Sequence, residues 1–192
     1  MTSVLSLRAI GAVLVIAVGL VTLVLVTSAP APADMVINGC TIVDNPTATN
    51  FTNCPGGADL SAANLSGANL RGANLHRANL TSAGLKYASL TDANLENALL
   101  PHTILWYVNL SRVDLTGANL NGSDLTGAYM GGSDLTDATL IDANLTDAAL
   151  THANLSGAKW TGANLTAAFW DDVTCPDGTN SNNDGDTCVG HL

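Results

Sequence analysis

The chain has 192 residues, of which 16 are Asp or Glu and 6 are Lys or Arg, so its formal net charge is −10. Proteins that bind nucleic acid need a basic face to meet the phosphates, and this charge balance argues against DNA or RNA as a ligand. The hydrophobic fraction of 47% overstates the apolar surface, because many of these residues are the Leu and Ala of an internal repeat that is expected to bury them.

Residues 9–26 form the first element, a run of eighteen apolar or small residues preceded by the basic residue Arg8. This pattern predicts an export signal, and the small residues Ala31 and Ala33 before Asp34 predict cleavage at that point, as in a secretory signal peptide. The length also permits a helix retained as a membrane anchor, which would tether the chain through 9–26. Segment 1–33 is therefore a signal peptide or an anchor. Both readings place the protein outside the cytoplasm, secreted or on the extracytoplasmic face of the membrane.

Four cysteines flank the central part of the chain. Cys40 and Cys54 lie in segment 34–57, and Cys175 and Cys188 lie in segment 171–192. An even number of cysteines in an exported chain predicts disulfides, and local pairing gives Cys40 with Cys54 and Cys175 with Cys188. The wide spacings, without neighbouring His ligands, argue against zinc. We expect these two segments to be disulfide-closed end caps.

The central segment, 58–170, is a repeat of five residues. From Leu60 to Trp170 every fifth residue is large and apolar, twenty Leu together with Met130, Trp160 and Trp170, and a small residue, usually Ala, stands two positions before each. A period of five fits neither a helix nor an alternating strand. The Leu and the earlier Ala can share an inward side only where the chain is extended. Four such sides, separated by corners, would close a square coil of twenty residues.

Runs such as Ala68-Asn69-Leu70-Arg71-Gly72 and Ala118-Asn119-Leu120-Asn121-Gly122 resemble the pentapeptide repeat family. The resemblance covers 58–170 and implies an all-β fold, a right-handed quadrilateral β-helix. With coils about 4.8 Å apart, the roughly 5.6 coils expected from 58–170 would form a rod about 27 Å long. Outward Asn, Asp, Ser, Thr and Gly are interpreted as structural residues of turns. Caps are expected at both ends, because bare terminal coils would expose strand edges and Leu.

The C-terminal segment contains a partial match to the start of a calcium-binding loop, Asn180-x-Asn182-x-Asp184-Gly185. Calcium loops of twelve residues end in a bidentate Glu, whereas the corresponding position here is His191. A tight turn bounded by a disulfide explains the same residues. We therefore predict no metal site and no cofactor, and keep calcium as an alternative.

The outward polar pattern breaks near the middle of the repeat, where several positions between 99 and 107 are apolar or aromatic. A coil of twenty residues would place Lys86 and Tyr87 beside Trp106 and Tyr107, so that an aromatic patch spans two coils. Exposed patches and Trp or Tyr residues often mark contact sites, although a cap loop folding back or neutral drift would account for the same residues. The candidate binding residues are Lys86, Tyr87, Leu99, Ile104, Trp106 and Tyr107. A smaller stripe, Tyr129, Ala149 and Phe169, could be a homodimer surface, ladder packing or a shelf for the C-terminal cap.

The sequence contains no Gly-rich phosphate loop, no helical His pair and no nucleophile elbow. The four His residues are far apart, and coil folding brings His152 only near a loose charged column without catalytic geometry, Asp92, Arg112, Gly132 and Asp172. We therefore predict a non-enzymatic structural or binding protein whose partner is an unknown protein or surface ligand. An acidic rod that mimics DNA, which the family implies for members that protect DNA gyrase, is the alternative. An enzyme on a β-helix scaffold is the weakest reading.

Overall fold

The structure is a computed structural model that describes residues 35–37, 40–42, 54–183 and 187–190. The predicted signal or anchor helix at 9–26, with the rest of segment 1–33, lies outside the described residues. Within the ranges that are described, no helix combines the length and the apolar character needed to cross a membrane.

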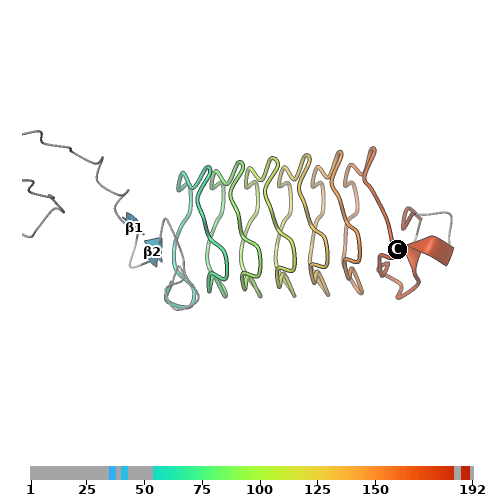
Figure 1. The fold of residues 1–192 in the computed structure, drawn as a ribbon, viewed down its shortest axis with the longest axis horizontal. Helices are drawn as coiled ribbons and strands as arrows, with labels where there is room; N and C mark the ends of the chain where they lie inside the picture. Colours follow the sequence, from blue (N-terminus) through green and yellow to red (C-terminus); the bar gives the residue numbers. More distant parts are fainter. Residues whose placement is uncertain (1–34, 38–39, 43–53, 184–186, 191–192) are drawn as a thin grey trace, which may run out of the picture. The chain divides into compact units, whose positions relative to one another are not determined.

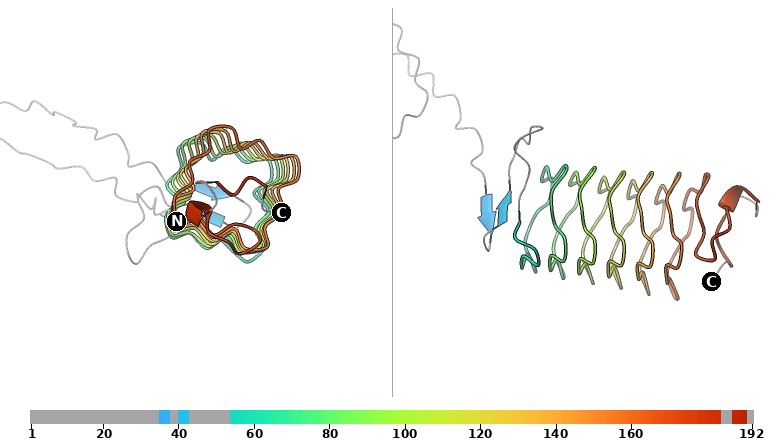
Figure 2. Two further views of the ribbon diagram at one scale, coloured as in Figure 1. Left: turned by 90° about the vertical axis from the view of Figure 1, so that its right-hand side faces the viewer. Right: turned by 90° about the horizontal axis from the view of Figure 1, so that it is seen from below.

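The repeat folds into stacked coils that are joined by parallel β-bridges (Figure 1). Each of these parallel bridges pairs a residue with the one twenty positions later, so the bridges form four columns that begin at Asp59, Asn64, Asn69 and Asn74. Viewed along the stack, the coils superpose in a four-sided outline (Figure 2). The predicted coil of twenty residues with four sides is confirmed, and each side is one column of bridges.

In the unit around Leu115, in the middle of the stack, every backbone N–H has a hydrogen-bond acceptor. Two N–H groups bond to the next coil, one to the preceding coil, one closes the turn within the unit, and one bonds to a side chain. Buried backbone groups must be paired in this way, which explains how a chain without long strands holds together. In the unit around Leu115 these bonds are Leu115 N–H to Asp134 O (2.7 Å), Gly117 to Thr136 O (2.9 Å), Asn119 to Ala98 O (2.9 Å), Ala118 to Leu115 O (2.9 Å) and Thr116 to Asp114 Oδ1 (3.0 Å).

The corner residue, two positions after each core residue, has a positive φ in every one of the twenty-three units from 62 to 172. Only eight of these residues are Gly, and the other fifteen are L-residues such as Arg77 (φ 57°), Tyr87 (58°) and Tyr107 (50°). The left-handed conformation costs an L-residue about 1–2 kcal/mol. The repeat therefore imposes its corner on whatever residue occupies it, because the hydrogen bonds to neighbouring coils fix the backbone on both sides.

The core of the solenoid is a stack of Leu side chains with Ala between them, and nearly all of these residues are buried. The polar residues that replace Ala inside the core are also paired. Thr103 Oγ1 donates to Leu80 O (2.8 Å), Ser123 Oγ to Leu120 O (2.7 Å), and Ser133 Oγ to the carbonyl of Met130 (2.6 Å). Buried hydroxyls cost little when hydrogen-bonded, so these substitutions leave the fold intact.

Both ends of the solenoid carry a disulfide, as the sequence predicts. At the N-terminal end, strands β1 (Met35–Ile37) and β2 (Cys40–Ile42) form an antiparallel pair, and Cys40 bonds to Cys54. At the C-terminal end, Cys175 bonds to Cys188 around the short 3-10 helix η1 (Ser181–Asn183). Cys40 and Ile42 are buried in the same core cluster as the repeat, so the N-terminal segment closes the core in addition to linking the chain.

Hydrogen bonds also fasten residues 180 and 182 to Asp172, the last corner residue of the solenoid. Asn180 Nδ2 donates to Asp172 Oδ1 (2.8 Å), and the Asp172 N–H donates to Asn182 Oδ1 (2.9 Å). Asn180 and Asn182, two residues of the partial calcium-loop match, thus form hydrogen bonds within the C-terminal cap. Asp184 and Gly185 lie outside the described residues. Trp170 is only 8% exposed and contacts Trp160 edge to face, with ring centroids 5.8 Å apart.

Candidate functional site

Most outward Asn and Asp residues have a structural role in the turns. Each stands immediately before a core residue, and its Oδ1 accepts the backbone N–H two positions later, as from Asn121 to Asn119 (3.0 Å) and from Ser156 to Asn154 (3.1 Å). This Asx interaction supplies the one acceptor that the neighbouring coils do not provide. Positions where the Asx residue is replaced are therefore informative.

Leu99 and Ile104 are two such replacements, and they differ. Leu99 comes two residues before Pro101, which has no N–H, so the turn needs no acceptor there. Ile104 comes two residues before Trp106. Its aliphatic side chain cannot accept a hydrogen bond from the Trp106 N–H. The bridges also place them apart, because Leu99 pairs with Asn79 and Asn119 whereas Ile104 belongs to the adjacent column. The structure thus separates Leu99 from the other predicted site residues.

The remaining predicted residues lie together around one corner, which we call the aromatic corner and define as Lys86, Tyr87, Ile104, Trp106 and Tyr107. The rings of Tyr87 and Tyr107 are stacked, with centroids 5.8 Å apart and planes 6° from parallel. The Lys86 Nζ lies 3.9 Å from the centroid of the Trp106 ring, a cation–π contact. Tyr87 is 65% exposed, so an ordered aromatic surface faces the solvent.

The stacked tyrosines lean toward the C-terminal end of the solenoid. A Cβ added to Gly127 would overlap the Tyr107 ring, so that ring covers the next corner. A Cβ added to Gly67, one coil before Tyr87, would contact nothing within 4 Å. The face of the Tyr87 ring that points toward the N-terminal coils is therefore open. Its other face stacks on Tyr107, and the Tyr107 ring in turn covers Gly127.

Trp106 is held from a second side by Asp124, in the following coil. Burial raises the pKa of Asp124, but hydrogen bonds from Thr126, Trp106 and Asn144 outweigh it and hold the pKa below its ordinary value. The Thr126 hydroxyl donates to Asp124 Oδ1 at 2.6 Å. Asp124 is thus ionised at neutral pH, and Trp106 contacts both a cation and an anion.

Several charged residues elsewhere on the solenoid form pairs on the surface. Arg112 donates two hydrogen bonds to Asp92 (2.7 and 3.0 Å), which lower the pKa of Asp92, and His152 Nδ1 lies 3.1 Å from Asp172 Oδ2. No group of three or more His, Cys, Asp or Glu in the described part of the chain is arranged to hold a metal ion. This column therefore contains ion pairs, Arg112 with Asp92 and His152 with Asp172.

Comparison with known proteins identifies the repeat. A family model described as pentapeptide repeats matches residues 58–97, 93–132, 118–157 and 143–169. The crystal structure of HetL, a pentapeptide repeat protein involved in heterocyst differentiation regulation from Nostoc sp. strain PCC 7120, is 33% identical, with a TM-score of 0.57 over 67% of this chain and 68% of that one.

A second solved structure shares the fold alone. A trypsin-treated variant of QnrB1, a plasmid-mediated fluoroquinolone resistance protein, is 23% identical, with a TM-score of 0.53 over 57% of this chain and 56% of its own. A comparison with curated proteins finds no match. Together with the bridges that join every coil to the next, the match over 58–169 shows that the chain belongs to the pentapeptide repeat family.

Proposed function

We propose that this pentapeptide repeat protein is exported and acts without catalysis, by binding a partner through the aromatic corner. The observation that supports the proposal is the exposed stack of Tyr87 on Tyr107 beside Trp106, at a place where other units carry Asx turns. Trp and Tyr are among the residues most enriched at binding hot spots, and solvent-exposed apolar patches often mark contact sites.

The order of the aromatic corner supports a binding role. Lys86 and Asp124 hold Trp106, and stacking together with the Gly127 corner holds Tyr107. Side chains that are already fixed lose little conformational entropy on binding, which favours affinity. A patch produced by neutral drift has no need of these supports.

The two disulfides support the proposed location outside the cytoplasm, because such bonds persist in oxidising compartments. The signal or anchor at 1–33 is the further part of this proposal. Cleavage would give a secreted protein, and retention would give one tethered to the extracytoplasmic face.

Site-specific photo-crosslinking in the native host tests the proposal. A benzoylphenylalanine placed at Tyr87 should form an adduct of higher mass, while the same residue at Ile141, which is also exposed but lies on another corner, should not. Trp106→Ala combined with Tyr107→Ala should remove the adduct and lower the thermal midpoint by only a few degrees, as expected from the loss of surface ring contacts. Equal crosslinking from both positions, or none from Tyr87, contradicts the proposal.

The charge distribution gives less support to the alternative of a DNA-mimicking rod. Residues 58–170 contain nine acidic and five basic residues, a net charge of only −4, and the rest of the negative charge is in the flanking segments. Gyrase is also cytoplasmic, whereas the proposed location is not. Inhibition of gyrase supercoiling by the purified protein would revive this alternative.

A further inference from the structure

We propose that the face carrying Tyr129, Ala149 and Phe169 binds a flat, uncharged β-1,4-linked glycan that lies along the axis of the solenoid. Parallel bridges pair Tyr129 with Ala149 and Ala149 with Phe169, so the three residues form one column. Tyr129 is 54% exposed and Phe169 is 58% exposed. Two rings thus project from one face, with only a methyl group between them.

The spacing of these rings is the first argument. Adjacent coils are separated by about 4.8 Å, the distance between paired strands, so residues two coils apart are about 9.6 Å apart. This is close to the disaccharide repeat of an extended β-1,4-linked glycan, in which every second sugar presents the same face. Each aromatic ring could stack on one of those sugars, while the small Ala149 leaves room for the sugar between them.

Charge is the second argument. The outward column of this face has no charged side chain, whereas each of the other three columns has at least one, such as Asp59, Asp124 or Asp114. A charged partner would find no counter-charge along this column, and an anionic polymer would be repelled by a chain of net charge −10. An uncharged polymer is the electrostatic complement. The column consists of Asn69, Ser89, Asn109, Tyr129, Ala149 and Phe169.

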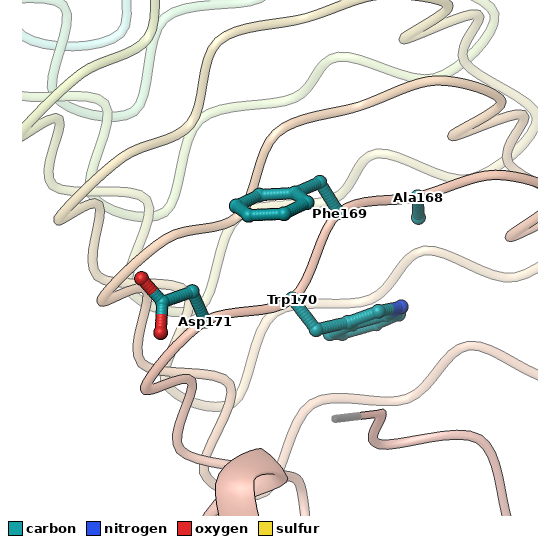
Figure 3. A pocket seen from close by; sticks show the side chains of 4 residues that line it. All are labelled: Ala168, Phe169, Trp170 and Asp171. Carbon is teal, nitrogen blue, oxygen red and sulfur yellow. The ribbon is translucent and has the colours of Figure 1, made fainter. Parts of the chain in front are cut away.

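The end of this face provides a polar group beside the last ring. Phe169 borders an open recess of about 310 Å³, which is also lined by Ala168, Trp170 and Asp171. Figure 3 shows the Phe169 ring and the Asp171 carboxylate projecting to the same side, and the Trp170 ring projecting to the other. The carboxylate can accept a hydrogen bond from a sugar hydroxyl where the glycan passes Phe169.

Depletion of the full chain from solution by insoluble glycans tests the proposal. The protein, kept in mild detergent, is mixed with cellulose or chitin particles and with a β-1,3-glucan, whose linkage gives a different repeat. Binding is expected to cellulose or chitin and not to the β-1,3-glucan. Tyr129→Ala and Phe169→Ala should each weaken binding about two- to tenfold, the effect of one lost aromatic contact. The double variant should not bind measurably.

Two further variants distinguish recognition by the spaced rings from non-specific adsorption and from binding at the aromatic corner. Ala149→Phe with Phe169→Ala keeps the number of aromatic rings but moves them to adjacent coils, so it should bind no better than Phe169→Ala. Trp106→Ala with Tyr107→Ala changes the aromatic corner and should bind the glycan like the wild type. Thermal midpoints of all variants show whether they are folded. Absence of wild-type binding to both β-1,4-glycans, equal binding to the β-1,3-glucan, or full binding by the ring-shifted variant would overturn the proposal.

Discussion

Gly127→Ala is expected to destabilise the protein in two separable ways. Gly127 has φ of +64°, so any L-residue there is strained by about 1–2 kcal/mol. The added Cβ would also overlap the Tyr107 ring and force it aside. Displacing that ring breaks its stack on Tyr87, which is worth about 0.5–1.5 kcal/mol. The combined loss in the free energy of unfolding is therefore about 1.5–3.5 kcal/mol.

A double-mutant cycle with Tyr107→Ala separates the two contributions. Without the Tyr107 ring, Gly127→Ala should cost only the backbone strain, about 1–2 kcal/mol. Urea unfolding followed by circular dichroism gives the four free energies. Gly132→Ala is the matched control for the strain alone, because its Cβ would lie at an ordinary 3.5 Å from Arg112 Cγ. A cost for Gly127→Ala that is the same with and without the Tyr107 ring would refute the contact between these corners.

Four further predictions concern the fold, the turns, the charge and the processing of the chain. Leu115→Ala, at a fully buried core position, should cost about 2–5 kcal/mol in chemical denaturation, and a smaller effect would mean that the stack collapses around the cavity. Asn119→Ala should cost about 1 kcal/mol, because the Asn121 N–H loses its acceptor, whereas Asn119→Asp keeps the acceptor and should be nearly neutral by the same assay. The folded pKa of Asp124 lies below the ordinary value of 3.8, so its stabilising effect is present above that pH and is lost as the pH falls through the folded pKa. Asp124→Asn should therefore flatten the decline of the thermal midpoint in acid. An unchanged decline would contradict this prediction. Intact mass after alkylation without reduction should show a chain beginning at Asp34 with four unalkylated cysteines; a full-length chain with alkylated cysteines would place the protein in a reducing compartment.

The fold could be predicted from the sequence because a single register, from Leu60 to Trp170, repeats without a slip. A period of five with a small residue two positions before each Leu allows few arrangements, and the bridges between residues twenty apart follow from it. The short antiparallel pair of β1 and β2 could not be predicted in this way, because segment 34–57 carries no repeat from which a pairing register follows.

The candidate site was predicted in part. The coil of twenty residues brings Tyr87 to Tyr107 and Lys86 to Trp106, as the structure shows. Leu99 lies on another face, since a corner separates it from Ile104. The support of Tyr107 by Gly127 was missed, although a glycine twenty residues after an aromatic corner residue is a signal that a comparison of successive coils would find.

The lean of the corner side chains limits how this surface can change. Gly117, Gly122, Gly127, Gly157 and Gly162 each lie beneath a side chain from the preceding coil, and a Cβ at any of them would collide with it. Tyr87 leans in the same way over Tyr107 and stacks on its ring, whereas the long side chain of Arg77 is followed twenty positions later by Asn97. A ring that leans toward the next coil needs either open space or a stacking partner at the residue twenty positions later, as Tyr107 and Tyr87 show. A designer who places an aromatic residue on one corner should therefore choose the residue of the following corner at the same time.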